Sequence, residues 1–131
     1  MNRLPAAQRI LLYAAFLVLL ATGVLWESVS AGPWASALMK VHGAAAMVAL
    51  VLIGTLIAHH IPAGWGSFRN RWSGVLLLTA LGWLVASGYL LYYSGSETLR
   101  SFASQSHLWV GLAGCMVAAL HLWRSAITSV R

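Results

Sequence analysis

Residues 107–124 read HLWVGLAGCMVAALHLWR, an apolar run of membrane-spanning length with one histidine at its start and another near its end. His107 and His121 are fourteen residues apart. On a helix of ~3.6 residues per turn, fourteen steps return to within roughly 40° of the starting direction, about 21 Å further along. In left-handed bundles, with a repeat of ~3.5 residues, the two directions coincide. We therefore predict a helix with an imidazole near each end of one face, and Gly114 midway between them.

The composition of the whole chain indicates a membrane protein. Of its 131 residues, 60% are hydrophobic and only 8% are charged, which is too apolar for an ordinary soluble domain. A spanning helix needs about 20 apolar residues, and four segments meet or approach that length. We expect an all-α fold, a single integral-membrane domain over residues 1–131 that forms a four-transmembrane-helix bundle. The expected helices are about 10–26, 36–60, 74–93 and 107–124.

Two breaks in this pattern set the expected ends of the helices. Ile61-Pro62 is expected to end the second helix, because a residue before proline avoids helical geometry. The polar segment 94–106 is expected to form a loop, with a short surface helix over residues 97–103.

The charges predict the topology and argue against nucleic acid as a partner. The formal net charge is +6, but the positive residues lie between hydrophobic segments rather than in one patch. If the helices alternate, most of the arginines fall on one side of the membrane. By the positive-inside rule both termini are then cytoplasmic, and the second and fourth helices run inward. We expect a multi-pass protein of the bacterial inner (cytoplasmic) membrane, in contact with membrane lipid.

All five histidines lie on the second and fourth expected helices: His42, His59, His60, His107 and His121. An ionisable residue inside a span is costly and suggests function. Two facing imidazoles are what a six-coordinate haem iron needs, and the core of a bundle is where such a cofactor fits. The pattern predicts two haem b groups, although one remains possible.

The outer haem is expected between His42 and His107, and the inner one between His121 and a histidine at the end of the second helix. His60 is favoured over His59 because eighteen steps from His42 return to nearly the same direction on a straight helix. Small residues after His42, and between the two histidines of the fourth helix, are expected to leave room for a flat macrocycle. The charge-free first and third helices are expected to serve packing, and the only repeat expected is a loose similarity between the second and fourth.

Other sites fit the sequence less well. A zinc or di-iron centre would need clustered ligands, and the spans contain no carboxylate. No CxxCH motif occurs, so covalent attachment of haem is excluded, and the single cysteine, Cys115, excludes a disulfide within the chain. The alternative function is a cofactor-free membrane anchor or structural subunit of a larger complex.

The histidine pattern resembles the haem-binding four-helix core of respiratory and photosynthetic cytochrome b, in which fourteen-step pairs hold two haems. The segments VHGAAAMVALVLIGTLIAHH and SHLWVGLAGCMVAALHLWR also resemble the cytochrome b subunits of formate dehydrogenase, hydrogenase and thiosulfate reductase complexes. This chain departs from the pattern because its second helix spaces the histidines by 17 or 18 residues and its first helix has none.

The resemblance implies an electron-transfer subunit of a membrane oxidoreductase complex in a respiratory chain, rather than a stand-alone enzyme. It would carry electrons between quinone or quinol and a periplasmic or membrane redox subunit. The axial ligands of the haem iron would be His42, His107, His121 and His60.

Overall fold

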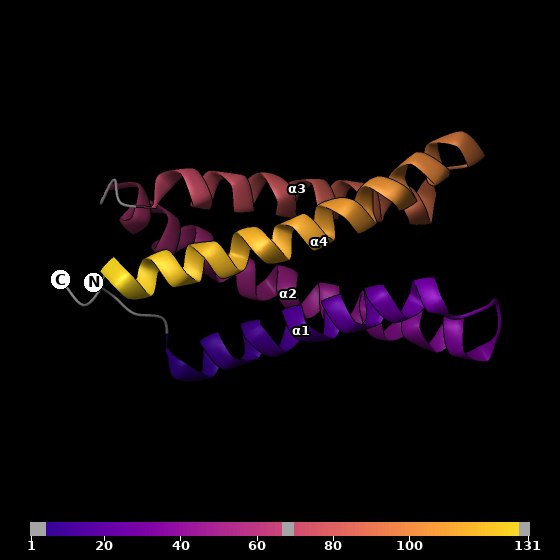
Figure 1. Cartoon of the computed structure of the whole chain (residues 1–131), viewed down its shortest axis with the longest axis horizontal. Coiled ribbons are helices and arrows are strands. Elements are labelled where there is room, and N and C mark those ends of the chain that lie inside the picture. The colour runs from indigo at the N-terminus through magenta and orange to yellow at the C-terminus, as the bar shows by residue number, and fades with distance from the viewer. Residues whose placement is uncertain (1–4, 67–69, 129–131) are drawn as a thin grey trace. The chain divides into compact units, whose positions relative to one another are not determined.

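The computed structural model describes residues 5–66 and 70–128, and this part of the chain is helical throughout apart from short connections (Figure 1). Its helices, in chain order, are α1 (Ala6–Ser28), α2 (Pro33–Gly66), α3 (Arg71–Tyr93) and α4 (Glu97–Thr128). The prediction of an all-α chain is confirmed.

Each helix is long and apolar enough to cross a membrane. The four candidate spans have mean hydropathies between 1.4 and 2.2, and the shortest has 23 residues. At ~1.5 Å per residue, 23 residues extend about 35 Å, which exceeds the roughly 30 Å hydrocarbon core of a bilayer. The chain therefore has the character of a multi-pass membrane protein, as the composition predicts.

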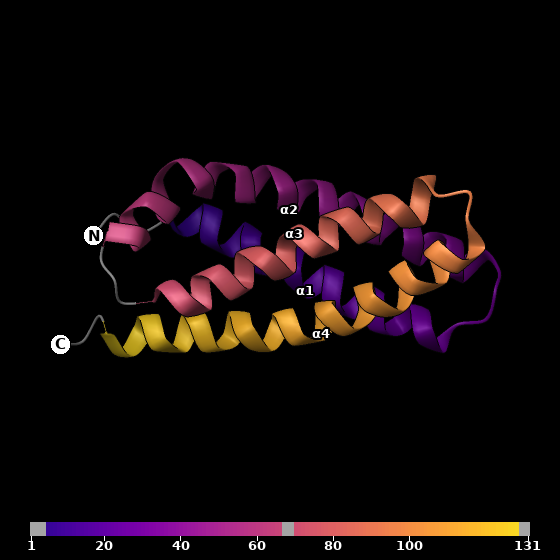
Figure 2. The same ribbon diagram turned by 90° about the horizontal axis from the view of Figure 1, so that it is seen from above.

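The chain divides into two compact units, Met1–Ser67 and Phe68–Arg131. In the first, α1 packs along α2, and in the second, α3 packs along α4 (Figures 1 and 2). We call these units the first and second hairpins. Few described side chains are buried, and large apolar side chains such as Leu17, Val51 and Met116 are two-thirds or more exposed. Such surfaces suit contact with lipid, or with another apolar surface, rather than with water.

The second helix is longer than predicted, because α2 continues through Pro62 to Gly66. Proline lacks a backbone N–H, so this position removes one hydrogen bond to the carbonyl of Ala58. A single lost bond is tolerated in the last turns of a long apolar helix, where it does not stop the chain from completing one more turn. The expectation that Ile61-Pro62 ends the helix is wrong.

The fourth helix is also longer than predicted, because it runs from Glu97 to Thr128. Residues 97–106 of the expected loop, including the expected short surface helix, form its first turns. Its start is set by Ser96, whose side-chain oxygen accepts a hydrogen bond from the backbone N–H of Leu99 at 3.3 Å. Glu97 stands in the first turn, where a negative charge favours the helix. The polarity of residues 97–106 suggests a loop, but a helix that projects beyond the apolar layer can be polar there.

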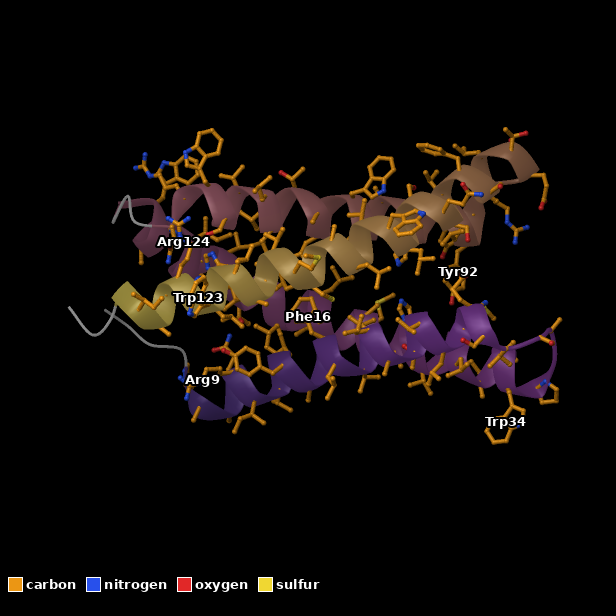
Figure 3. All side chains as sticks on the ribbon, in the orientation of Figure 1. Arg9, Phe16, Trp34, Tyr92, Trp123 and Arg124 are labelled. Atoms are coloured by element: carbon orange, nitrogen blue, oxygen red, sulfur yellow. The ribbon has the colours of Figure 1, made fainter. Side chains whose placement is uncertain are left out.

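The ends of each hairpin carry aromatic and basic side chains. Figure 3 shows Arg9 near the open end of the first hairpin and Trp34 near its turn. In the second hairpin, Tyr92 lies near the turn, and Trp123 and Arg124 lie towards the open end. These are the residue types that favour the interface between lipid and water, and the side chains of Trp34 and Tyr92 are 77% and 65% exposed.

Candidate functional site

His107 is held by a serine of α3 that no pattern in the sequence singles out. The Ser87 hydroxyl lies 2.8 Å from Nδ1 of His107, and the Ser87 side chain is completely buried. A Cβ atom added to the next residue, Gly88, would lie 3.7 Å from Cε1 of the same ring. The two-residue segment Ser87-Gly88 thus contacts one edge of the imidazole through a hydrogen bond and through a close approach of the backbone.

The hydrogen bonds of Ser87 assign the proton on His107. The hydroxyl has a single hydrogen, and its oxygen lies 2.7 Å from the carbonyl oxygen of Trp83, one turn back on α3. Since the hydroxyl donates to that carbonyl, it accepts from the N–H at Nδ1 of His107. The neutral ring is then the tautomer whose Nε2 carries the lone pair, which is the form that ligates a metal.

His121 is held in the same way, near the other end of the second hairpin. The Ser73 hydroxyl lies 2.9 Å from Nδ1 of His121 and 3.2 Å from the carbonyl oxygen of Asn70, to which it donates. A Cβ atom on Gly74 would lie 3.8 Å from Cε1 of the ring. Both histidines of α4 therefore lie on the face that meets α3, which confirms that fourteen residues return to one face.

The glycines at positions 111 and 114 of α4 lie against α3. A Cβ atom on Gly114 would lie 3.7 Å from Cβ of Ala80, and one on Gly111 would lie 3.7 Å from the Leu84 side chain. Both positions face α3, so their small size allows the two helices to pack closely. The expectation that these two glycines leave room for a macrocycle stays a prediction.

His42 has the matching arrangement in the first hairpin. The Thr22 hydroxyl lies 2.8 Å from Nδ1 of His42 and 2.7 Å from the carbonyl oxygen of Val18, so it donates to the carbonyl and accepts from the ring. A Cβ atom on Gly23 would lie 3.6 Å from Cε1. Thr22 is only 7% exposed. Three histidines thus share one device, which we call a hydroxyl–glycine pair: Thr22-Gly23 for His42, Ser87-Gly88 for His107 and Ser73-Gly74 for His121.

The hydroxyl–glycine pairs reveal an internal repeat that relates the two hairpins. Thr22 and His42 are 20 residues apart, as are Ser87 and His107. Ser87 and His107 follow Thr22 and His42 by 65 positions each. At this offset, residues 10–25 (ILLYAAFLVLLATGVL) and residues 75–90 (VLLLTALGWLVASGYL) are identical at seven of sixteen positions. The repeat thus runs from hairpin to hairpin and includes α1 and α3. The sequence prediction of a loose similarity confined to the second and fourth helices is too narrow.

The remaining two histidines lie near the end of α2. His60 is described and exposed, whereas the side chain of His59 lies outside the described part of the structure. The prediction that His60 rather than His59 is a ligand stays a prediction. The pairings of His42 with His107, and of His121 with His60, would join the two hairpins, and they also stay predictions.

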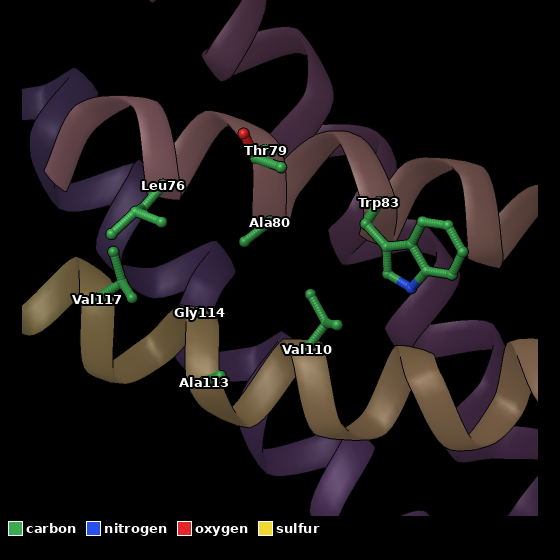
Figure 4. Close-up of a pocket in the computed structure, with 8 residues that line it drawn as sticks. All are labelled: Leu76, Thr79, Ala80, Trp83, Val110, Ala113, Gly114 and Val117. Carbon is green, nitrogen blue, oxygen red and sulfur yellow. The ribbon is translucent and has the colours of Figure 1, made fainter. Parts of the chain in front are cut away.

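An apolar groove of about 380 Å³ lies between α3 and α4 at the level of Ala80 and Gly114 (Figure 4). Trp83 lines it, and its indole nitrogen is turned towards α4. Among the described residues, that nitrogen is one of two buried polar side-chain atoms without a hydrogen-bond partner. The groove is thus an apolar surface with one buried hydrogen-bond donor, the indole N–H of Trp83, that lacks an acceptor.

Across residues 5–66 and 70–128, no three His, Cys, Asp or Glu side chains gather as a metal-binding group. A haem iron takes two axial ligands, so a haem would not need such a group. No protein-family model, curated protein or solved structure matches this chain. The histidines and the residues that hold them are therefore the features from which the function of this chain can be inferred.

Proposed function

We propose that this chain is a membrane b-type cytochrome, an electron-transfer subunit that holds haem b through histidines of α2 and α4. The observation that supports this most strongly is the hydrogen bond that Nδ1 of each of three histidines inside the apolar spans donates to a buried or half-buried hydroxyl. Histidines that ligate metals commonly donate the hydrogen of their second nitrogen to such a partner, which fixes the ring and makes it a better ligand.

The residues present fit a haem. Each of the three imidazoles is fixed in direction at its Nδ1 edge, and a haem iron would be bound through Nε2 on the other side of the ring. A glycine of the neighbouring helix lies beside Cε1 of each ring, where an added Cβ atom would make an ordinary contact at 3.6–3.8 Å. Haem supplies a metal that accepts and releases one electron, while the chain supplies the axial ligands and an apolar surrounding.

The ligand sets that we propose are His42 with His107 for an outer haem, and His121 with His60 for an inner one. Each set takes one histidine from each hairpin. Two haems at two depths would carry electrons across the bilayer between quinone or quinol and a periplasmic or membrane redox subunit. We further propose that the membrane is the bacterial cytoplasmic membrane and that both termini are cytoplasmic, which the distribution of arginines supports.

The test is a reduced-minus-oxidised absorption spectrum of the purified protein, with haem quantified per chain. We expect a sharp b-type α band and an electron paramagnetic resonance signal of low-spin iron with two imidazole ligands. Haem should leave the protein in acidified organic solvent, because the chain has no CxxCH motif to hold it covalently. Folded protein that takes up no haem would refute the proposal and favour the cofactor-free anchor instead.

A further inference from the structure

The groove between α3 and α4 contains a hydrogen-bond donor that no described residue satisfies. The groove has a volume of about 380 Å³ and lies at the level of Ala80 and Gly114 (Figure 4). The indole nitrogen of Trp83 is buried at its wall, and among residues 5–66 and 70–128 no acceptor lies within hydrogen-bonding distance of it. Since a buried donor without an acceptor is costly, this N–H points to an occupant that brings one.

The side chains around the indole fix its orientation but do not supply an acceptor. The ring of Phe102 lies T-shaped to it, with the ring centroids 6.1 Å apart and an interplanar angle of 81°. An aromatic ring is a much weaker acceptor than a carbonyl oxygen. The other polar side chain that lines the groove, Thr79, turns its hydroxyl away from it (Figure 4). The groove thus offers its occupant apolar walls and one N–H.

The depth of Trp83 excludes the acceptors that are common at a membrane surface. Trp83 is the thirteenth of the 23 residues of α3, so it lies near the middle of this candidate span. Water is absent from the middle of a bilayer. The polar groups of lipids lie at the edges of a hydrocarbon core of roughly 30 Å, which places them about 15 Å from the middle. The acceptor therefore belongs to a molecule that carries it into the apolar layer.

A flat carbonyl compound fits these conditions better than another helix does. A spanning helix already uses its backbone carbonyls in its own hydrogen bonds, whereas a quinone brings an apolar ring with free carbonyl oxygens. The volume of about 380 Å³ falls within the range of small-molecule pockets, roughly 300–1,000 Å³. We propose that the groove binds the ring of a quinone, one carbonyl oxygen of which accepts the hydrogen bond from Trp83. The choice of quinone as the carbonyl compound rests on the proposed function.

The groove holds the quinone but does not protonate it. None of the eight residues that line the groove has an acidic or basic side chain, so the ring receives no proton from them. Gly114, at the level of the groove, is seven residues from His107 and seven from His121, which is about 10 Å along α4 in each direction. The bound ring therefore lies at a depth midway between the two histidines of the second hairpin.

The experiment measures how tightly the full-length protein in detergent binds two ligands of similar shape. Menadione is a quinone without an isoprenoid tail, and methylnaphthalene has the same fused rings without the carbonyls. Trp83→Phe keeps an aromatic ring but removes the N–H. It should weaken menadione binding by about 2- to 12-fold, the effect of one net hydrogen bond, and change methylnaphthalene binding much less.

Two further variants test the position of the site. Ala113→Leu, at an exposed alanine that lines the groove, should weaken the binding of both ligands because it fills the space that they occupy. Trp109→Phe, at an exposed tryptophan of α4 outside the groove, is the matched control and should weaken neither. Circular dichroism checks that each variant is folded.

The outcomes separate this inference from the proposed function. The inference is overturned if menadione shows no saturable binding, or if Trp83→Phe weakens the binding of both ligands equally. It is overturned as well if Trp83→Phe leaves menadione binding unchanged but dissociates an oligomer, because the acceptor then belongs to a second copy of the chain. None of these results removes haem from the wild-type protein. Folded protein without haem refutes the proposed function, and menadione binding still reports on the groove.

Discussion

Replacing Ser87 by alanine tests whether a hydroxyl on α3 positions a haem ligand on α4. Ser87 is completely buried and its oxygen lies 2.8 Å from Nδ1 of His107, so alanine removes the acceptor and leaves little room for water to replace it. A buried donor left without a partner costs about 1–3 kcal/mol. Loss of a partner of a metal ligand typically weakens metal binding by about 10- to 100-fold, which is the same range of free energy.

We therefore expect Ser87→Ala to weaken haem binding at His107 by about 10- to 100-fold. The assay is titration of haem into the haem-free protein, followed by redox titration of the α band. The midpoint potential of this haem should rise, because an imidazole whose N–H has lost its acceptor donates less charge to the iron. A merely structural defect would lower the amount of folded protein without moving the potential of what remains.

Two further variants serve as controls for Ser87→Ala. Ser87→Thr should behave like the wild type, since Thr22 performs the same task at the equivalent position of the first hairpin. Ser101→Ala removes an exposed hydroxyl from α4 and should change neither affinity nor potential. The reasoning fails if Ser87→Ala binds haem as tightly as the wild type, with the same potential, while His107→Ala loses that haem.

Three more predictions follow from the hairpins. Gly88→Ala should be nearly neutral, because its methyl group would meet the His107 ring at an ordinary contact of 3.7 Å, whereas Gly88→Leu should displace the ring and lower haem content; equal effects would contradict this account. His42→Ala and His107→Ala should each remove the same low-spin signal, measured by electron paramagnetic resonance; signals lost from different haems would show that the two are not a pair. Pro62→Ala should raise the melting temperature measured by circular dichroism, because it restores a backbone hydrogen bond to the carbonyl of Ala58. A proline inside a helix costs about 3 kcal/mol. An unchanged or lower melting temperature would mean that the last turns of α2 do not limit the stability of the protein.

The membrane class of the protein and the shared face of His107 and His121 could be predicted from the order of the amino acids alone. Four apolar segments of about 20 residues favour helices in a bilayer, because a helix satisfies its backbone N–H and C=O groups within each segment. The fourteen-residue interval between His107 and His121 also fixed a common face, since helical periodicity depends only on spacing. Helix ends were less predictable: Pro62 did not end α2, and the polar residues after Glu97 did not form a loop.

The residues that contact this face of α4 could not be predicted, because they depend on how α3 packs against it. Nothing in the sequence distinguishes Ser73 and Ser87 from other residues of an apolar helix. In the structure, Ser73 lies 2.9 Å from Nδ1 of His121, which is 48 residues away, and Ser87 lies 2.8 Å from Nδ1 of His107, which is 20 residues away. A hydrogen bond between two helices depends on the register and the rotation of both helices. The spacing of residues along one helix predicts neither the register nor the rotation. The repeat is present in the sequence, in the segments ATGVL and ASGYL. Its structural role is shown by the hydrogen bonds of Thr22 with His42 and of Ser87 with His107.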